Sequence, residues 1–320
     1  MSVLFIRMMM LLLLTLPPEI WVSHGFGMET LPTVEETTEP PTDDPGPLPY
    51  PDGPALQGIP VKTTYYGEYY GANYLTLDGG GQVCNDTDVP NDELAMLGRV
   101  PPHIPLPTDG TPAVLVLHTH TTACYLPEGS VVADPAFGYR TTDPAYDMAA
   151  VGAVFCAQLE AAGIGVVHAA DVHDYPSCAG SYARSAETVQ RILEEWPDIA
   201  VVVDIHRGST PMDGAVPQPV VTIAGRETAQ VRLVAEAIEG EAARTSFRLA
   251  CMYQQQMAGD CPGLTRPIAL GDHAYGTDLT PARLLLEVGT QGNTLSQACE
   301  AAALSGRALA RTLRTLQEES

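Results

Sequence analysis

The sequence has few positively charged residues. Its 16 lysines and arginines stand against 39 aspartates and glutamates, which gives a formal net charge of −23 over 320 residues. A protein that binds a polyanion needs basic residues gathered on one surface. No stretch of this chain gathers them, so we expect no nucleic acid as partner. The acidic excess fits an exported protein that its charge keeps soluble.

The seven cysteines include no C-x-x-C pair, and their number is odd. This spacing gives no signal for a zinc ribbon and no disulfide framework. Cys251 and Cys261 flank a polar stretch and could pair in an oxidising compartment. Cys156 and Cys299 fall in helical apolar patterns, where cysteine acts as a small core residue.

The N-terminal region has no apolar run long enough to span a bilayer, which takes about 20 residues. Arg7 precedes an apolar run of nine residues, 8–16, and a second short run ends at Val22. This pattern favours an export signal or a marginal membrane anchor in residues 1–27. We therefore expect an exported protein at the extracytoplasmic face of the membrane or in the cell-wall space, with membrane association through its N-terminus.

The rest of the chain divides by composition into three parts. Residues 28–60 are rich in Pro, Thr and acidic residues, which predicts a disordered tether. Residues 61–110 contain Tyr-rich extended segments and predict a small β segment packed on the main domain. Residues 111–320 form the predicted main domain.

The main domain alternates strand-like and helix-like segments. We expect strands at 113–118, 165–168, 199–206, 220–223 and 282–287, and helices at 147–162, 183–195, 226–246 and 295–317. Strands that alternate with helices predict an α/β fold, in which a mainly parallel sheet is covered by helices on both faces.

Three of the predicted strands end on residues that can bind a metal or move a proton. One ends on His118 and His120, one on His206 and one on Glu287. In an open α/β sheet, active sites lie at the carboxyl ends of the strands. Zinc takes imidazole and carboxylate ligands and leaves a position open to water in catalytic sites. We predict His120 and His206 as zinc ligands and Glu287 as general acid and base.

The remaining roles stay open at this point. Asp143, His118 and Cys124 are alternatives for the third zinc ligand. His118 or Arg207 could instead stabilise an oxyanion.

Residues at these strand ends could also have structural roles instead of catalytic ones. Asp204 could orient His206 or cap a loop, and Glu287 could be an ion-pair partner of Arg207 or Arg283.

Several motifs occur in a fixed order over residues 110–318, and together they resemble the stage II sporulation protein P family. This family is related to the zinc-dependent N-acetylmuramoyl-L-alanine amidases of bacterial cell walls. The motifs are His118-Thr-His-Thr-Thr122, Asp171-Val-His-Asp-Tyr-Pro176, Asp204-Ile-His-Arg207, Tyr275-Gly-Thr-Asp-Leu-Thr-Pro281 and Leu285-Leu-Glu-Val-Gly289.

The resemblance implies an amidase-like fold and a peptidoglycan hydrolase that acts in engulfment during sporulation. Such an enzyme cuts the amide between N-acetylmuramic acid and the L-alanine of the stem peptide, and cleavage of peptide cross-links is a further activity of the family. The resemblance implies zinc and a lytic transglycosylase partner, the stage II sporulation protein D. It places the zinc histidines at His120 and His206, a zinc carboxylate near Asp143, and the catalytic glutamate at Glu287.

Two positions depart from the family pattern. Ala123 stands where the family usually carries a glutamate, and Gly208 stands where it carries an aspartate. These departures motivate an alternative from another class, a wall-binding or scaffold protein that keeps the fold without full activity. A zinc carboxypeptidase-like enzyme on a related sheet is a third interpretation.

Overall fold

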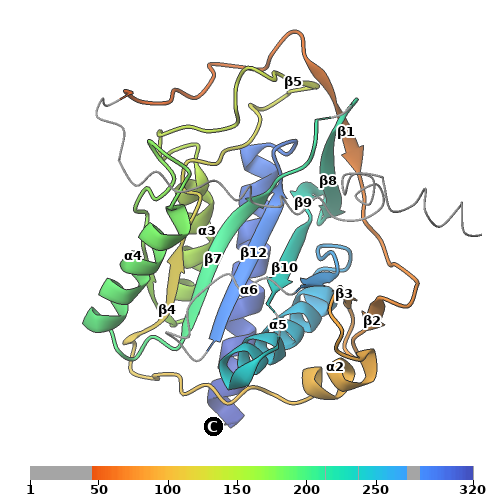
Figure 1. The fold of residues 1–320 in the computed structure, drawn as a ribbon, viewed down its shortest axis with the longest axis vertical. Helices are drawn as coiled ribbons and strands as arrows, with labels where there is room; N and C mark the ends of the chain where they lie inside the picture. Colours follow the sequence, from red (N-terminus) through yellow and green to blue (C-terminus); the bar gives the residue numbers. More distant parts are fainter. Residues whose placement is uncertain (1–44, 213, 237, 272–281, 320) are drawn as a thin grey trace, which may run out of the picture. The chain divides into compact units, whose positions relative to one another are not determined.

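The computed structural model describes residues 45–212, 214–236, 238–271 and 282–319 (Figure 1). The predicted export or anchor segment, 1–27, and the first part of the predicted tether, 28–44, lie outside the described residues. Among the residues that are described, no helix is long and apolar enough to cross a membrane.

A mainly parallel sheet of eight strands forms the centre of the fold, as the sequence predicted. The strand order is β2-β3-β11-β10-β12-β7-β4-β6, and all neighbours are parallel except β2–β3 and β10–β12. The strands are β2 (Tyr74–Thr76), β3 (Gln82–Asn85), β4 (Pro112–Leu117), β6 (Gly165–His168), β7 (Val201–Gly208), β10 (Val231–Ala235), β11 (Ile268–Leu270) and β12 (Ala282–Thr290).

A smaller sheet and five described helices complete the domain. The small sheet has the order β5-β1-β8-β9. Its strands are β1 (Ile59–Thr64), β5 (Val132–Ala133), β8 (Val216–Ile223) and β9 (Arg226–Ala229). The helices are α2 (Asn91–Gly98), α3 (Met148–Ala161), α4 (Ser181–Glu195), α5 (Gly240–Asp260) and α6 (Leu295–Glu319).

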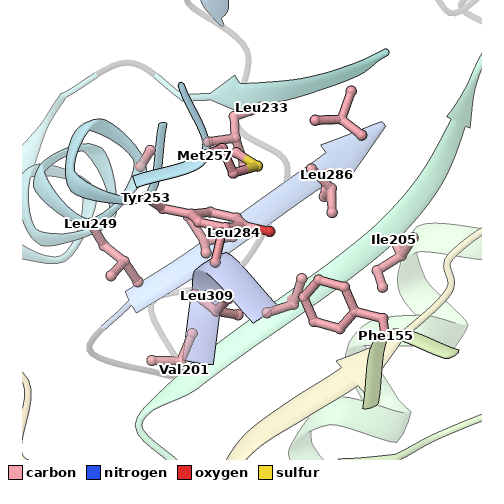
Figure 2. Close-up of a cluster of buried hydrophobic side chains, with 14 of the residues drawn as sticks. Phe155, Val201, Ile205, Leu233, Leu249, Tyr253, Met257, Leu284, Leu286 and Leu309 are labelled. Atoms are coloured by element: carbon pink, nitrogen blue, oxygen red, sulfur yellow. The ribbon is translucent and has the colours of Figure 1, made fainter. Parts of the chain in front are cut away.

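Helices cover both faces of the large sheet, and the side chains of strand β4 show which helices lie on which face. Val114 and Val116 point into the large core with the side chains of α3, α5 and α6. Leu115 and Leu117 point to the opposite face, where Val189 of α4 packs. Successive side chains of a strand point to opposite faces, so a continuous apolar strand is buried on both sides. Figure 2 shows part of the large core around β7 and β12.

The predicted helix at 226–246 is wrong. Strands β9 and β10 occupy residues 226–235, and α5 begins only at Gly240. Val231 and Leu233 are completely buried on one face of β10. Hydrogen bonding to β11 and β12 on either side favours the strand, because sheet pairing overrides a weak local helix propensity.

The region 61–110, expected as a small β segment packed on the main domain, contributes strands to both sheets. Strands β2 and β3 extend the large sheet through β11, and the helix α2 was not predicted. All seven cysteines are free. Cys251 lies within α5 and Cys261 directly follows it, so about 15 Å of helix separates the two, too far for a disulfide.

The described end of the predicted tether has irregular backbone but packs on the domain. The Tyr50 ring stacks on Tyr146 with a centroid distance of 4.2 Å, and its hydroxyl donates to the Tyr125 carbonyl over 3.1 Å. Leu48 and Thr142 hydrogen-bond through their backbones at 2.9 Å. Aromatic burial here offsets the entropy of a chain that its composition alone would leave disordered.

Candidate active site

Three charged or ionisable side chains lie side by side on adjacent strands of the large sheet. His206 of β7 is the register partner of Glu287 of β12, and Glu287 is the register partner of Arg232 of β10. Paired residues of neighbouring strands point to the same face of a sheet. Leu286 and Val288 face the large core. The row therefore lies on the opposite face, the one that α4 covers beside β4.

His120 reaches this row from the loop that follows β4. Its ring centroid lies 5.2 Å from that of His206, with the planes at 82°. The Tyr182 ring of α4 packs edge-on against His120, with centroids 5.5 Å apart. The structure thus brings His120, His206 and Glu287 together from three different strand ends.

Asp204 fixes the orientation of His206 from the same strand. It is completely buried and accepts hydrogen bonds from the Thr119 amide at 3.0 Å and the Thr119 hydroxyl at 2.6 Å. Arg283 approaches the other side of the carboxylate at 3.4 Å. Burial alone would raise the pKa of Asp204, but His206 and Arg283 hold it well below its usual range. Burial alone would lower the pKa of His206, and Asp204 raises it.

The Nε2 atom of His206 is buried without a directed hydrogen bond. It lies 2.9 Å from Oδ1 of Asp204, but the geometry is that of an ion contact and not of an N–H donated to the oxygen. Burial and the neighbouring His206 lower the pKa of His120 to about 4, so its imidazole is neutral at pH 7. Neutral imidazole is the form that binds metals. A neutral imidazole at His120, whose ring centroid lies 5.2 Å from that of His206, is the donor chemistry that a divalent cation would take from these two residues.

A second group of residues surrounds His120, and the sequence interpretation missed it as part of the site. The Nδ1 atom of His120 lies 4.0 Å from Oδ2 of Asp174 and 3.9 Å from Sγ of Cys178. Arg140 donates to both of these groups at 3.1 Å. The motif at 171–176 was the signal that could have pointed to Asp174.

His118 lies on the other face of the sheet. Its Nε2 is 2.9 Å from Nε2 of His168, and its Nδ1 is 3.0 Å from the Ile205 carbonyl. Burial and the neighbouring His168 lower its pKa to about 3. It continues the alternation of Val114 and Val116 and therefore points under α3. This burial leaves His118 no contact with a substrate at the His120–His206 pair.

Asp143 occupies an exposed turn before α3, where its Oδ1 accepts a hydrogen bond from the Ala145 amide at 3.0 Å. The residue that begins the helix is Asp147, whose carboxylate accepts from the Ala149 amide at 2.8 Å. In the part of the chain that the structure describes, the hydrogen bond of the Asp143 carboxylate stays within its own turn. Its role as a zinc ligand stays a prediction.

Arg207 and Cys124 lie near each other, away from the row. Arg207 donates from Nη1 to the Gly208 carbonyl at 3.2 Å and to Oε1 of Gln291 at 3.3 Å. Burial lowers its pKa. Burial also raises the pKa of the Cys124 thiol to about 12, which disfavours the thiolate that binds metals.

The two departures from the family pattern have distinct surroundings. Ala123 is buried in the large core. At Gly208, a Cβ atom would meet the Gly289 carbonyl oxygen at 2.8 Å and Oε2 of Glu287 at 3.5 Å. Glycine at 208 thus permits the close approach of β7 and β12 beside Glu287.

Outside the masked stretches, no three His, Cys, Asp or Glu side chains form a group arranged to hold a metal ion. The described residues therefore bring together two histidines and the carboxylate of Glu287, without a complete ligand set.

Comparison with solved structures finds amidases, at low similarity. The N-acetylmuramoyl-L-alanine amidase AmiC2 of Nostoc punctiforme is 16% identical, with a TM-score of 0.37, over 64% of this chain and 97% of that chain. The CwlD amidase from Clostridioides difficile, in complex with the GerS lipoprotein, is 10% identical, with a TM-score of 0.39, over 65% of this chain and 100% of that chain. The catalytic domain of CwlV, an N-acetylmuramoyl-L-alanine amidase from Bacillus (Paenibacillus) polymyxa var. colistinus, is 13% identical, with a TM-score of 0.36, over 63% and 97% of the two chains.

A comparison with curated proteins found no match. The family comparison is decisive instead, because it spans most of the chain. Residues 83–313 match Stage II sporulation protein P (SpoIIP), a range that includes the whole row on β7, β12 and β10 together with His120. The chain belongs to the stage II sporulation protein P family.

Proposed function

We propose that this protein is a peptidoglycan hydrolase of sporulation, an N-acetylmuramoyl-L-alanine amidase that acts with zinc. The observation that carries the proposal is the convergence of His120, His206 and Glu287 at one site in a chain of this family. Endopeptidase cleavage of cross-links is the finer alternative within the same reaction class, because both reactions hydrolyse an amide.

His120 and His206 are the residues that would hold zinc. When bound, zinc supplies a Lewis acid that polarises the amide carbonyl and makes water a better nucleophile at neutral pH. Asp204 fixes the ring of His206 through its own hydrogen bonds to Thr119, as a carboxylate behind a metal-binding histidine does.

Glu287 is the group that moves the proton. Arg232 binds its Oε2 atom through two nitrogens, at 2.7 and 2.6 Å, and so fixes the position of that oxygen. The carboxylate lies beside His206, where it can take a proton from the attacking water and return it to the leaving amine.

The test is digestion of purified peptidoglycan by the full chain, with and without a chelator, followed by mass analysis of the products. We expect whole stem peptides that begin with L-alanine, no release with chelator, and recovery after added zinc. Free amino acids in place of stem peptides would indicate the carboxypeptidase-like interpretation.

The zinc ligands are tested by metal analysis of His120→Ala and His206→Ala. Each should lower the zinc content, because each removes one imidazole ligand. His103→Ala is the matched control, since His103 is an exposed histidine outside the site. Equal zinc in all three variants would exclude the assignment.

A scaffold function remains the second candidate, and one observation favours it. Ala123 stands as a buried apolar side chain where the family pattern has a glutamate. A protein that binds wall material, holds no zinc and releases no stem peptide would support this candidate. One tightly held zinc per chain together with stem-peptide release would exclude it.

Location and partner belong to the same proposal. We place the protein at the extracytoplasmic face of the membrane or in the cell-wall space, and give it a lytic transglycosylase of the stage II sporulation protein D type as partner. The CwlD amidase, a structural neighbour, is seen in complex with a lipoprotein. Protease accessibility in intact sporulating cells tests the location, and co-purification with the transglycosylase tests the partner.

A further inference from the structure

The row of side chains on the sheet continues past Arg232 to a second arginine. Arg266 lies directly before β11, and its amide donates to the Val231 carbonyl of β10 at 2.8 Å. Its guanidinium lies over the ring of Tyr66, with Cζ 4.3 Å from the ring centroid. A guanidinium held over an aromatic face by a cation–π contact still has its N–H donors to offer to a ligand.

Tyr66 is itself held firmly in place. Its amide donates to Oε1 of Gln230 at 2.8 Å, and its carbonyl accepts from Nε2 of Gln230 at 2.9 Å. Gln230 is 1% exposed and also donates to the Gly263 carbonyl at 2.8 Å. The platform under Arg266 is therefore built from buried, satisfied hydrogen bonds and not from a loose surface tyrosine.

Among the described residues, Arg232 and Arg266 both lie within the influence of one carboxylate, Glu287. Arg232 and Glu287 neutralise each other as an ion pair. Arg266 is half-buried, and among the ion pairs of the described residues it has no carboxylate partner. Burial, and then the neighbouring positive charge of Arg232, lower the pKa of Arg266, while the charge of Glu287 acts in the opposite direction. A desolvated cation without a partner is costly, so a site of this kind favours an incoming anion.

We propose that Arg266 and Tyr66 form a subsite that binds a carboxylate of the substrate peptide. We call it the Arg266–Tyr66 subsite. It rests on the proposed function, because it assigns the peptide side of the substrate to the β10–β11 side of Glu287. Among the described residues Arg266 combines an aromatic platform with the absence of a carboxylate ion pair, and this combination favours an acidic ligand.

The spacing of the strands sets where the carboxylate lies along the peptide. His206, Glu287, Arg232 and Arg266 stand on or beside four adjacent strands, β7, β12, β10 and β11. Three strand spacings of about 4.8 Å make about 14 Å between the ends of the row. An extended peptide covers about 3.5 Å per residue, so the carboxylate lies roughly two to four residues from the scissile amide.

The test is calorimetric binding of two soluble peptides to the full chain. The first is a tetrapeptide that begins with N-acetyl-L-alanine and carries free carboxylates, and the second is the same peptide with each carboxylate converted to a carboxamide. Neither contains the muramyl amide, so binding is measured apart from that cleavage. We expect the free-acid peptide to bind at least about fivefold more tightly, because a partly desolvated arginine–carboxylate contact is lost in the amide.

Variants of Arg266 test whether the preference for the free-acid peptide depends on this residue. Arg266→Met should reduce the ratio of the two affinities to about one, while Arg266→Lys should keep part of it, since lysine retains the charge but not the planar stack. Arg226→Met is the matched control. Arg226 is an exposed arginine on β9, away from the site, and pairs with Glu300 of α6. Circular dichroism and the unfolding midpoint verify that each variant is folded.

Three results would overturn the subsite: equal binding of both peptides to the unaltered chain, an undiminished ratio in folded Arg266→Met, or no binding of the free-acid peptide up to millimolar concentration. Failure of the proposed function is recognised separately, as absence of stem-peptide release from walls. A chain that releases no stem peptide and still loses carboxylate preference in Arg266→Met would keep the subsite and lose the amidase.

Discussion

Arg232 on β10 holds Glu287 on β12 by one oxygen. Its Nε and Nη2 atoms lie 2.7 and 2.6 Å from Oε2, and the two side chains are 10% and 17% exposed. The two residues are register partners across an antiparallel pair within an otherwise mostly parallel region of the sheet. The position of the candidate base therefore depends on the pairing of β10 with β12.

Removing both partners of this pair should destabilise the protein by less than the two single changes added together. Arg232→Met leaves a largely buried carboxylate without its cation and should lower the free energy of unfolding by about 3 kcal/mol. The double variant Arg232→Met/Glu287→Met should lower it by clearly less than the sum of the single changes. Urea unfolding measures all three, and simple additivity would show that the contact contributes little.

Glu287→Gln should separate catalysis from metal binding. The amide keeps the size of the side chain but cannot take up the proton, so we expect stem-peptide release to fall by at least about a hundredfold. Zinc content should stay near that of the unaltered protein, because His120 and His206 remain. Glu300→Gln is the matched control, because Glu300 is a half-buried carboxylate outside the site that pairs with Arg226. Wall digestion at the normal rate by Glu287→Gln would rule out Glu287 as the base.

Asp147 should make stability depend on pH. Burial raises its pKa from 3.8 to about 6. The folded state then binds the proton more tightly than the unfolded state, so this contribution is full below pH 3.8 and is lost as the pH rises through 6. Asp147→Asn keeps a good N-cap for α3 and should raise the free energy of unfolding at pH 7.5 by up to about 3 kcal/mol.

This advantage of Asp147→Asn should shrink at pH 4.5, where the carboxyl of the unaltered protein is mostly protonated. Urea unfolding of metal-free protein at the two pH values measures it. Glu93→Gln serves as control, because Glu93 is exposed in the first turn of α2. A gain that is the same at both pH values would show that the charge of Asp147 is not its cause.

Gly208→Ala should be unfavourable although it adds only a methyl group. The new Cβ would lie 2.8 Å from the Gly289 carbonyl oxygen, so β7 and β12 would have to separate beside Glu287. We expect a loss of about 1–3 kcal/mol in the free energy of unfolding. Gly259→Ala, which has open space around its Cβ position in α5, should be neutral or stabilising. Thermal unfolding compares them, and equal midpoints would contradict the close approach.

Local sequence patterns were sufficient to predict the strands that are apolar throughout and buried on both faces of the sheet. The runs that became β4, β7 and β12 contain so few polar side chains that only the interior of an α/β sheet accommodates them, and their last residues then fall at one edge. The fold class and the grouping of His120, His206 and Glu287 follow from this. The same reasoning failed at 226–246, because β10 is a strand by virtue of its neighbours β11 and β12.

The sequence by itself determined the family, the alternation of strands and helices, and the residue types that meet at the strand ends, because these depend on local periodicity and on ordered motifs. Only the tertiary structure decided that His118 points under α3 while His120 faces His206, and that Arg232, Asp174 and Arg266 join the neighbourhood of the site. The reason is that strand order, register and the face of each side chain are fixed by pairing between segments far apart in the chain, and no local pattern contains that information.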